Sequence, residues 1–202
     1  MEDLFSNITD VLDEINDDRE EVLNMSRDIV RKCSTAIKSI HREEFNEYKK
    51  NIKIIKNDLH KIRGLVSKNP GYLYKYLKTP EQEYAEARLL YAIIKKKDIP
   101  THLELDIDPL HYALGCADVV GELRRHILDI IRQSDIERIN ELLEKMDEIY
   151  SHLFSMDYPS GLTKDLRHKT DVARKLVEKT RGDISLSIQM NNLSELLKKK
   201  TE

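Results

Sequence analysis

The chain has 202 residues, which is enough for one domain with a substantial hydrophobic core. Its 34 basic and 37 acidic residues nearly balance, so any polyanion site must come from local clustering of charge. The two cysteines are too few for a disulfide framework and favour a reducing compartment. The sequence has no signal peptide and no apolar run long enough to cross a bilayer, so we expect a cytoplasmic protein without membrane contact.

The spacing of apolar residues predicts helices throughout and no β-strands. Glycine (6) and proline (5) are scarce, which favours long helices. Seven helices are predicted, over residues 1–15, 17–40, 43–66, 79–97, 108–133, 135–154 and 162–179. The predicted fold class is therefore all-α, with one helical domain over residues 1–182 and a lysine-rich tail over residues 183–202 that can itself be helical.

The first three predicted helices differ in how strongly they are patterned. Asp17 and Asp18 are placed to cap the second helix, after a short first helix with an apolar stripe. The third helix has an unbroken three-and-four spacing of apolar residues, which is typical of a packing seam in a bundle or with a partner helix. The seam consists of Phe45, Tyr48, Ile52, Ile55, Leu59, Ile62 and Val66.

Capping residues mark the starts of the next three helices. Thr79-Pro80 is expected to provide the N-cap and the first helical position of the fourth helix, with Gln82 completing a capping box. Asp108-Pro109 opens the fifth helix, and Asp135 caps the sixth. Near the end of the chain, Arg181-Gly182 is expected to interrupt the last helix before the tail.

Two of the predicted helices each carry a pair of carboxylates. Glu83 and Glu86 lie on the fourth helix, and Asp118 and Glu122 lie on the fifth. Residues three or four apart share a helix face, so two such helices packed together would offer four oxygen ligands. Hard cations such as Mg²⁺, or Mn²⁺ as the alternative, prefer ligands of this kind. The pattern predicts metal-assisted chemistry on a phosphate, although acids near a helix start are also favoured by the helix dipole alone.

The second pair lies in an apolar stretch of the fifth helix. Acids buried among such neighbours must be paired, protonated or metal-bound, so Asp118 and Glu122 are the more specific pair. Gly115 and Gly121 each cost about 1 kcal/mol inside a helix relative to alanine, so we expect another backbone or a ligand to approach closely there. The structural alternative is a buried ion pair, with a partner among Arg88, Arg124 and Arg125.

Other catalytic patterns are missing from the sequence. The seven histidines lack zinc-ligand spacing, no Glu-x-x-His tetrapeptide suggests a di-iron bundle, and there is no phosphate-binding glycine loop. We expect each histidine to lie at the surface. All-α nucleoside triphosphate pyrophosphatases also use Glu-x-x-Glu followed by a second acidic pair, and they are the enzymatic alternative.

Three stretches of the chain resemble the translin superfamily. They are residues 18–42, 82–87 and 112–123, and the two acidic motifs keep their neighbours as well as their charges. The closer resemblance is to the translin-associated factor X branch, as an archaeal-type member, and it extends from about residue 17 to the Arg181-Gly182 break. It implies a seven-helix fold of the translin type and assembly into a hollow homo-oligomer, expected to be an octamer.

The resemblance also implies an activity. In that family the factor X subunit is the catalytic half of an endoribonuclease that cleaves single-stranded RNA with Mg²⁺, and its acidic residues lie in the two matching motifs. This implies catalytic and metal-binding roles for Glu83, Glu86, Asp118 and Glu122. The expected function is a Mg²⁺-dependent endoribonuclease. A non-catalytic scaffold that binds single-stranded RNA or DNA, like translin, is the alternative.

Basic residues near the acids are candidates to bind RNA phosphates. Such contacts would position a strand without reading its sequence. The candidates are Arg27, Arg31, Arg88, Arg124 and Arg125. For each one a solvated charge or a salt bridge is the plainer interpretation, except for Arg27, which falls within a matched motif.

Overall fold

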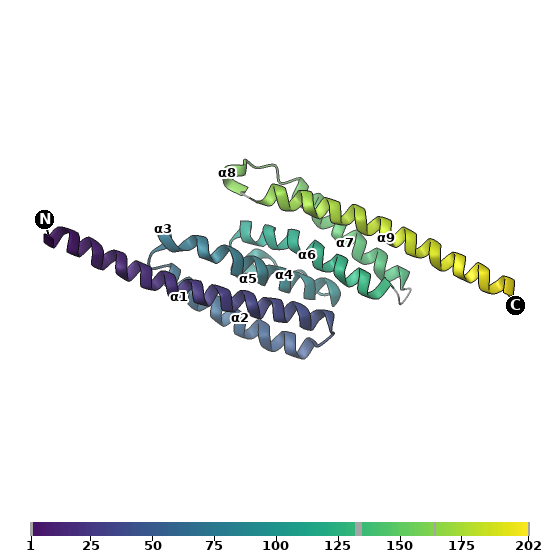
Figure 1. Cartoon of the computed structure of the whole chain (residues 1–202), viewed down its shortest axis with the longest axis horizontal. Coiled ribbons are helices and arrows are strands. Elements are labelled where there is room, and N and C mark those ends of the chain that lie inside the picture. The colour runs from purple at the N-terminus through teal and green to yellow at the C-terminus, as the bar shows by residue number, and fades with distance from the viewer. Residues whose placement is uncertain (1, 132–134, 164, 202) are drawn as a thin grey trace. The chain divides into compact units, whose positions relative to one another are not determined.

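The computed structural model describes residues 2–131, 135–163 and 165–201, and every regular element in these ranges is a helix (Figure 1). The predicted all-α fold is confirmed. In chain order the elements are α1 (Glu2–His41), α2 (Phe45–Val66), α3 (Pro70–Leu73), the 3-10 helix η1 (Tyr74–Leu77), α4 (Lys78–Ile94), α5 (His102–Leu105), α6 (Pro109–Ile130), α7 (Ile136–Phe154), α8 (Ser160–Thr163) and α9 (Leu166–Thr201).

The chain divides into two compact units. Unit 1 contains Met1–Tyr91 and Pro100–Gly115, and unit 2 contains Ala92–Ile99 and Cys116–Glu202. The long helices α4 and α6 each begin in unit 1 and end in unit 2. None of the helices in the described ranges is both long and apolar enough to cross a membrane.

Unit 1 is built on the antiparallel pair α1 and α2, which lie side by side (Figure 1). Most of the predicted seam of α2 is buried within this unit, and only Phe45 and Ile52 of the seam are half-buried. The neighbouring helix α1 buries a stripe that includes Ile29, Cys33 and Ile40. Tyr91 of α4 stacks on Tyr48 of α2, with ring centroids 4.1 Å apart. The α2 seam therefore serves the interior of the bundle and is not a surface for a partner helix.

Unit 2 is built on the pair α7 and α9, also side by side in Figure 1. Its core comes from four-residue and three-residue repeats on α6, α7 and α9, which bury one stripe of each helix. The buried residues include Val119, Leu123 and Ile127 of α6, Ile139, Leu142 and Met146 of α7, and Ala173, Val177 and Ile184 of α9.

Of the caps predicted at Thr79, Asp108 and Asp135, the last two are present and the first is not. Asp108 accepts hydrogen bonds from the backbone N–H groups of Leu110 (2.7 Å) and His111 (3.3 Å) at the start of α6. Asp135 accepts one from the N–H of Arg138 (3.0 Å) at the start of α7. Helix α4, however, begins at Lys78 directly after η1, so Thr79 lies inside its first turn and is not the N-cap.

Two predicted breaks are continuous helix. Helix α1 runs through Asp17-Asp18, where Asp18 is buried and receives the Lys68 ammonium at 3.0 Å. Helix α9 runs through Arg181-Gly182 to Thr201, so the tail is helical. One mid-helix glycine costs only about 1 kcal/mol, and buried Val177 and Ile184 stabilise α9 on either side. The predicted boundaries at Met1, Gln133 and Glu202 lie outside the described residues.

Candidate functional site

Helix α4 brings Glu83 and Glu86 close to α1 in unit 1. Glu86 is buried, with 7% of its surface exposed, and Glu83 is half-buried. Burial, and then the nearby charges of Glu83 and Glu86, raise the pKa of the Cys33 thiol on α1. The pair therefore faces the interior of the unit. Acids that were favoured only by the dipole at a helix start would be expected at the surface instead.

Gly115 allows α6 to approach α4 at the turn that carries this acidic pair. A Cβ atom added at Gly115 would lie 2.7 Å from the Ala85 Cβ, 2.7 Å from the Gln82 carbonyl oxygen and 3.2 Å from the Glu86 backbone nitrogen. No side chain fits in that space, so the predicted close approach at Gly115 is confirmed. At Gly121 the expectation is wrong, because the nearest atom is a Leu176 methyl group at an ordinary 3.8 Å.

Asp118 and Glu122 lie on the part of α6 that belongs to unit 2. Each side chain is 25% exposed, so the two acids are half-buried and not fully enclosed as expected. The Lys169 ammonium of α9 donates to the Asp118 carboxylate at 2.5 Å. Arg125 lies 3.8 Å from the Glu122 carboxylate. An ion pair is thus present at Asp118, but its cation is Lys169 and not one of the three arginines named from the sequence.

The five candidate RNA-binding arginines have different surroundings. On α1, Arg27 and Arg31 are exposed, with Arg27 3.5 Å from the Asn24 side chain and Arg31 paired with Asp28. Arg88 is half-buried and donates to the Tyr84 hydroxyl at 2.9 Å.

The remaining two arginines lie on α6 in unit 2. The side chain of Arg125 is 54% exposed. That of Arg124 is only 13% exposed and is held by Asp183 (2.7 Å) and Thr180 (2.9 Å) of α9. The geometry therefore leaves Arg125 accessible to a phosphate and commits Arg124 to packing between α6 and α9.

The acids offer only oxygen ligands, which suit a hard cation such as Mg²⁺. Within the described part of the chain, no group of three or more His, Cys, Asp and Glu side chains is gathered to hold a metal ion. At Asp118 the Lys169 ammonium supplies the positive charge that a bound cation would supply. The chemistry of the donors fits the implied metal, and Lys169 would compete with it at Asp118.

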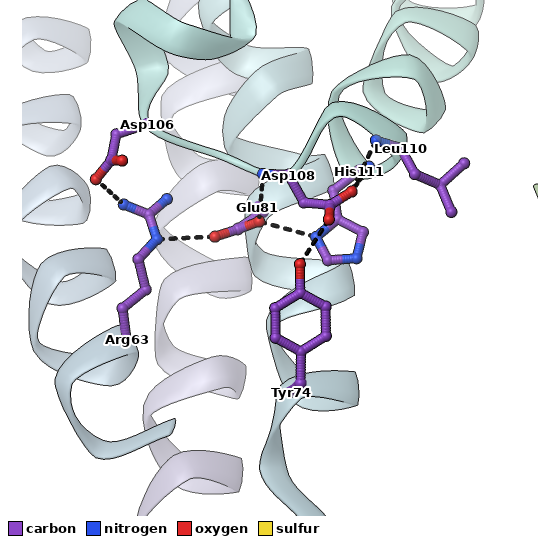
Figure 2. A network of polar contacts seen from close by, with 7 residues as sticks. All are labelled: Arg63, Tyr74, Glu81, Asp106, Asp108, Leu110 and His111. Carbon is purple, nitrogen blue, oxygen red and sulfur yellow. Dashed lines mark hydrogen bonds and ion pairs between the residues drawn. The ribbon is translucent and has the colours of Figure 1, made fainter. Parts of the chain in front are cut away.

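A second group of polar side chains in unit 1 was not anticipated from the sequence. Its centre is Glu81 (Figure 2), which lies two residues before Glu83 and is only 3% exposed. One carboxylate oxygen accepts from the Arg63 Nε at 2.8 Å, and the other accepts from the Asp108 backbone N–H at 3.1 Å and contacts the His111 Nδ1 at 2.8 Å. Burial alone would raise the pKa of Glu81, but the hydrogen bonds from His111, Asp108 and Arg63 together hold it below its usual value.

Neighbouring side chains extend this network. Arg63 also donates to Asp106 at 2.9 Å, and the Tyr74 hydroxyl donates to Asp108 at 2.5 Å (Figure 2). That hydrogen bond, followed by burial, raises the pKa of Tyr74 to about 12. His111 is buried, and so is His126, so the expectation that every histidine lies at the surface is wrong for both. The sequence feature that could have indicated the position of His111 is its spacing of three residues from Asp108, which places it beside the cap of α6.

Comparison with known proteins agrees with this architecture. The chain is 38% identical over 183 residues to the uncharacterized protein MJ0175 of Methanocaldococcus jannaschii, covering 90% of this chain and 81% of that protein. Among solved structures, it is similar to AfC3PO, both alone and in a complex with duplex RNA. Each of these matches has 27% identity and a TM-score of 0.85, covering 92% of this chain and 97% of the other.

A third structure, apo-NeC3PO, shares the fold at 23% identity and a TM-score of 0.82, covering 91% of this chain and 96% of that one. The model of the Translin family matches residues 17–181, which include both acidic pairs. Because the match spans most of the chain, this protein belongs to the Translin family.

Proposed function

We propose that the protein is a Mg²⁺-dependent endoribonuclease of the translin-associated factor X type, acting on single-stranded RNA. The observation that supports this most is the contact of Gly115 with Gln82 and Ala85. It brings the α6 backbone against the turn of α4 that carries Glu83 and Glu86. Asp118 follows Gly115 by three residues, which is about one helical turn.

In this proposal Glu83, Glu86, Asp118 and Glu122 are the residues that would hold the cation, which would be Mg²⁺ or alternatively Mn²⁺. The chemistry that such an ion supplies is Lewis-acid activation of water and neutralisation of charge on the scissile phosphate. The half-buried Arg88 and the exposed Arg125 lie on the same helices as the acids and would bind neighbouring phosphates.

The choice of RNA as substrate is supported by the relative AfC3PO, whose structure is described as a duplex RNA complex. The test must therefore include both single-stranded and duplex RNA. Pure protein should be incubated with Mg²⁺ and labelled single-stranded RNA, duplex RNA or nucleoside triphosphates. We expect cleavage of single-stranded RNA that stops when a chelator is added. Chelator-resistant cleavage would contradict the metal mechanism, and hydrolysis of the triphosphates alone would favour the pyrophosphatase alternative.

Changing Glu86 to Gln or Asp118 to Asn distinguishes the proposed enzyme from a scaffold that only binds RNA. Each change keeps the side-chain volume but removes a charged ligand, so we expect cleavage to fall by about 100-fold or more. RNA binding should persist, because a negative charge beside the phosphates is lost. Glu178→Gln, on the exposed face of α9, is the matched control and should cleave like the wild type. Wild-type cleavage by both site variants would contradict the proposal.

A scaffold that binds RNA without cleaving it is the second candidate. It is favoured by the ion pair of Asp118 with Lys169, which occupies one proposed ligand. Under this alternative the wild-type protein binds RNA and cleaves none. The Asp118→Asn variant would then lose stability, because the Lys169 ammonium would be left without its carboxylate.

A further inference from the structure

Helix α2 carries a concentration of positive charge that the proposed site does not use. Its 22 residues include five lysines and one arginine against one glutamate and one aspartate, a net charge of +4. The whole chain has a formal net charge of −3. Because the overall composition is nearly balanced, binding of a polyanion requires local clustering of positive charge, and α2 provides it.

The outer face of α2 presents this charge to solvent. Lys49, Lys53, Lys56 and His60 follow each other at spacings of four, three and four residues, so they form one row along the helix. All four side chains are exposed. The three lysines of the row form no ion pair with any residue that the structure describes, so their charges are uncompensated.

The two acids of α2 do little to cancel this charge. Asp58 is held by the Lys32 ammonium of α1 at 2.6 Å, so its more distant contact with Lys61, at 3.9 Å, is weak. Glu47 lies 3.6 Å from Lys50 in an exposed pair. Exposed ion pairs contribute about 0–1 kcal/mol, so a ligand can displace them at little cost.

A cavity of about 480 Å³ adjoins the row at its C-terminal end. Its polar lining comes from Lys56, Asn57, His60, Lys61, Arg63 and Asp106. Arg63 uses Nε and Nη1 on Glu81 and Asp106, but its Nη2 is buried and has no hydrogen-bond partner among the described residues. Buried donors are rarely left unpaired, and a phosphate oxygen is a strong acceptor for guanidinium.

We propose that the outer face of α2 binds the phosphates of a nucleic-acid strand, with one phosphate entering the cavity beside Arg63. The row from Lys49 to His60 is about 16 Å long, too long for one phosphate and suited to a strand. This inference rests on the proposed function and adds to it a strand-binding surface separate from the four acids. The surface does not depend on any of the five arginines identified from the sequence.

The test is the salt dependence of RNA binding. A labelled single-stranded oligoribonucleotide is titrated with protein in chelator, so that no cleavage occurs, at several salt concentrations. For the Lys53→Gln/Lys56→Gln variant we expect weaker binding and a slope of log affinity against log salt shallower by about 1.4, because each lost phosphate contact removes about 0.7. Glutamine keeps the helix propensity of lysine, so these exposed changes leave the fold intact.

The matched control is Lys175→Gln/Lys179→Gln on the exposed face of α9, which removes the same charge elsewhere. It should keep the wild-type slope and affinity. An α2 variant that binds like the wild type, or a control that loses as much affinity as the α2 variant, overturns the inference. A mononucleotide should not compete with the oligoribonucleotide. If it did compete, the surface would be a site for a single phosphate and not for a strand, which would overturn the proposal.

Cleavage assays on the same variants distinguish this inference from the proposed function. If the wild type binds RNA through α2 but cleaves none, the proposed enzyme fails and the strand-binding surface stands. If the α2 variant cleaves with unchanged KM, the surface fails and the enzyme stands. A wild-type protein that binds no RNA overturns both.

Discussion

Glu81 shows how a single buried carboxylate can organise one end of unit 1. It joins Arg63 of α2 to His111 and the Asp108 backbone at the start of α6, and it lies only two residues before Glu83. Because its hydrogen bonds hold the pKa of Glu81 below the usual value, this carboxylate is charged in the folded protein wherever it is charged in the unfolded chain. Loss of this carboxylate would leave Arg63 partly buried without its main partner.

We predict that Glu81→Gln lowers the free energy of unfolding at pH 7 by about 3 kcal/mol, the scale for removing one partner of a buried ion pair. A folded-state pKa below the unfolded value means that the contribution is fully present above about pH 4.5 and is lost as the pH falls through the folded value. Urea unfolding of wild type and variant at pH 7 and below pH 4 measures this. The difference should shrink on acidification.

The control for that prediction is Glu178→Gln on the exposed face of α9. The side chain of Glu178 forms no hydrogen bond or ion pair with another residue that the structure describes, so this change should cost less than about 0.5 kcal/mol. A Glu81→Gln protein as stable as the wild type at pH 7 would mean that the network contributes no net stability.

Sequence reasoning found the acidic pairs but not this network, and the reason is physical. A pair three or four residues apart is visible because the helix itself brings the two side chains together. Arg63 lies 18 residues from Glu81 and His111 lies 30 residues away, so only tertiary packing brings them together. The same reason explains why Lys169, 51 residues from Asp118, was not predicted as its partner.

At the scale of the helices, the apolar periods predicted the elements well and the polar breaks predicted their ends poorly. The α2 seam and the caps at Asp108 and Asp135 are present. Helix α1, however, continues through Asp17-Asp18, and α9 continues through Gly182. A local stop signal costs about 1 kcal/mol or less, which packing on either side readily overcomes. The sequence shows the signal but not the packing that opposes it.

Gly115 provides a test of how α4 and α6 pack in unit 1. Gly115→Ala should destabilise the protein by about 1–3 kcal/mol, because its methyl group would meet backbone and Cβ atoms of α4 at 2.7 Å. Gly64→Ala on α2 is the matched control: no atom lies within 4 Å of the added methyl, so we expect a gain of about 0.4–1 kcal/mol. Thermal unfolding of the two variants measures this, and equal effects would contradict the close contact.

At the scale of the whole molecule, exposed apolar side chains indicate where chains could contact each other. The α2 seam is used inside unit 1. Exposed apolar side chains lie instead on the first turns of α1, where Phe5, Ile8 and Leu12 are 59%, 47% and 50% exposed. Their spacing of three and four residues makes one stripe on a helix face. An exposed stripe of this kind marks an interaction surface, which supports the homo-oligomer that the family resemblance implies.

We predict that the wild-type protein sediments as a large closed oligomer at micromolar concentration, of eight chains by resemblance to its family. Ile8→Glu/Leu12→Glu should shift it to smaller species, because two charges would be buried at each contact of the α1 stripe. Ser6→Glu/Asn7→Glu adds the same charge outside the stripe and should leave the assembly intact. Sedimentation velocity distinguishes these outcomes. A monomeric wild type would contradict the assembly itself, whereas an intact oligomer in the Ile8→Glu/Leu12→Glu variant would mean that surfaces other than the α1 stripe hold the chains together.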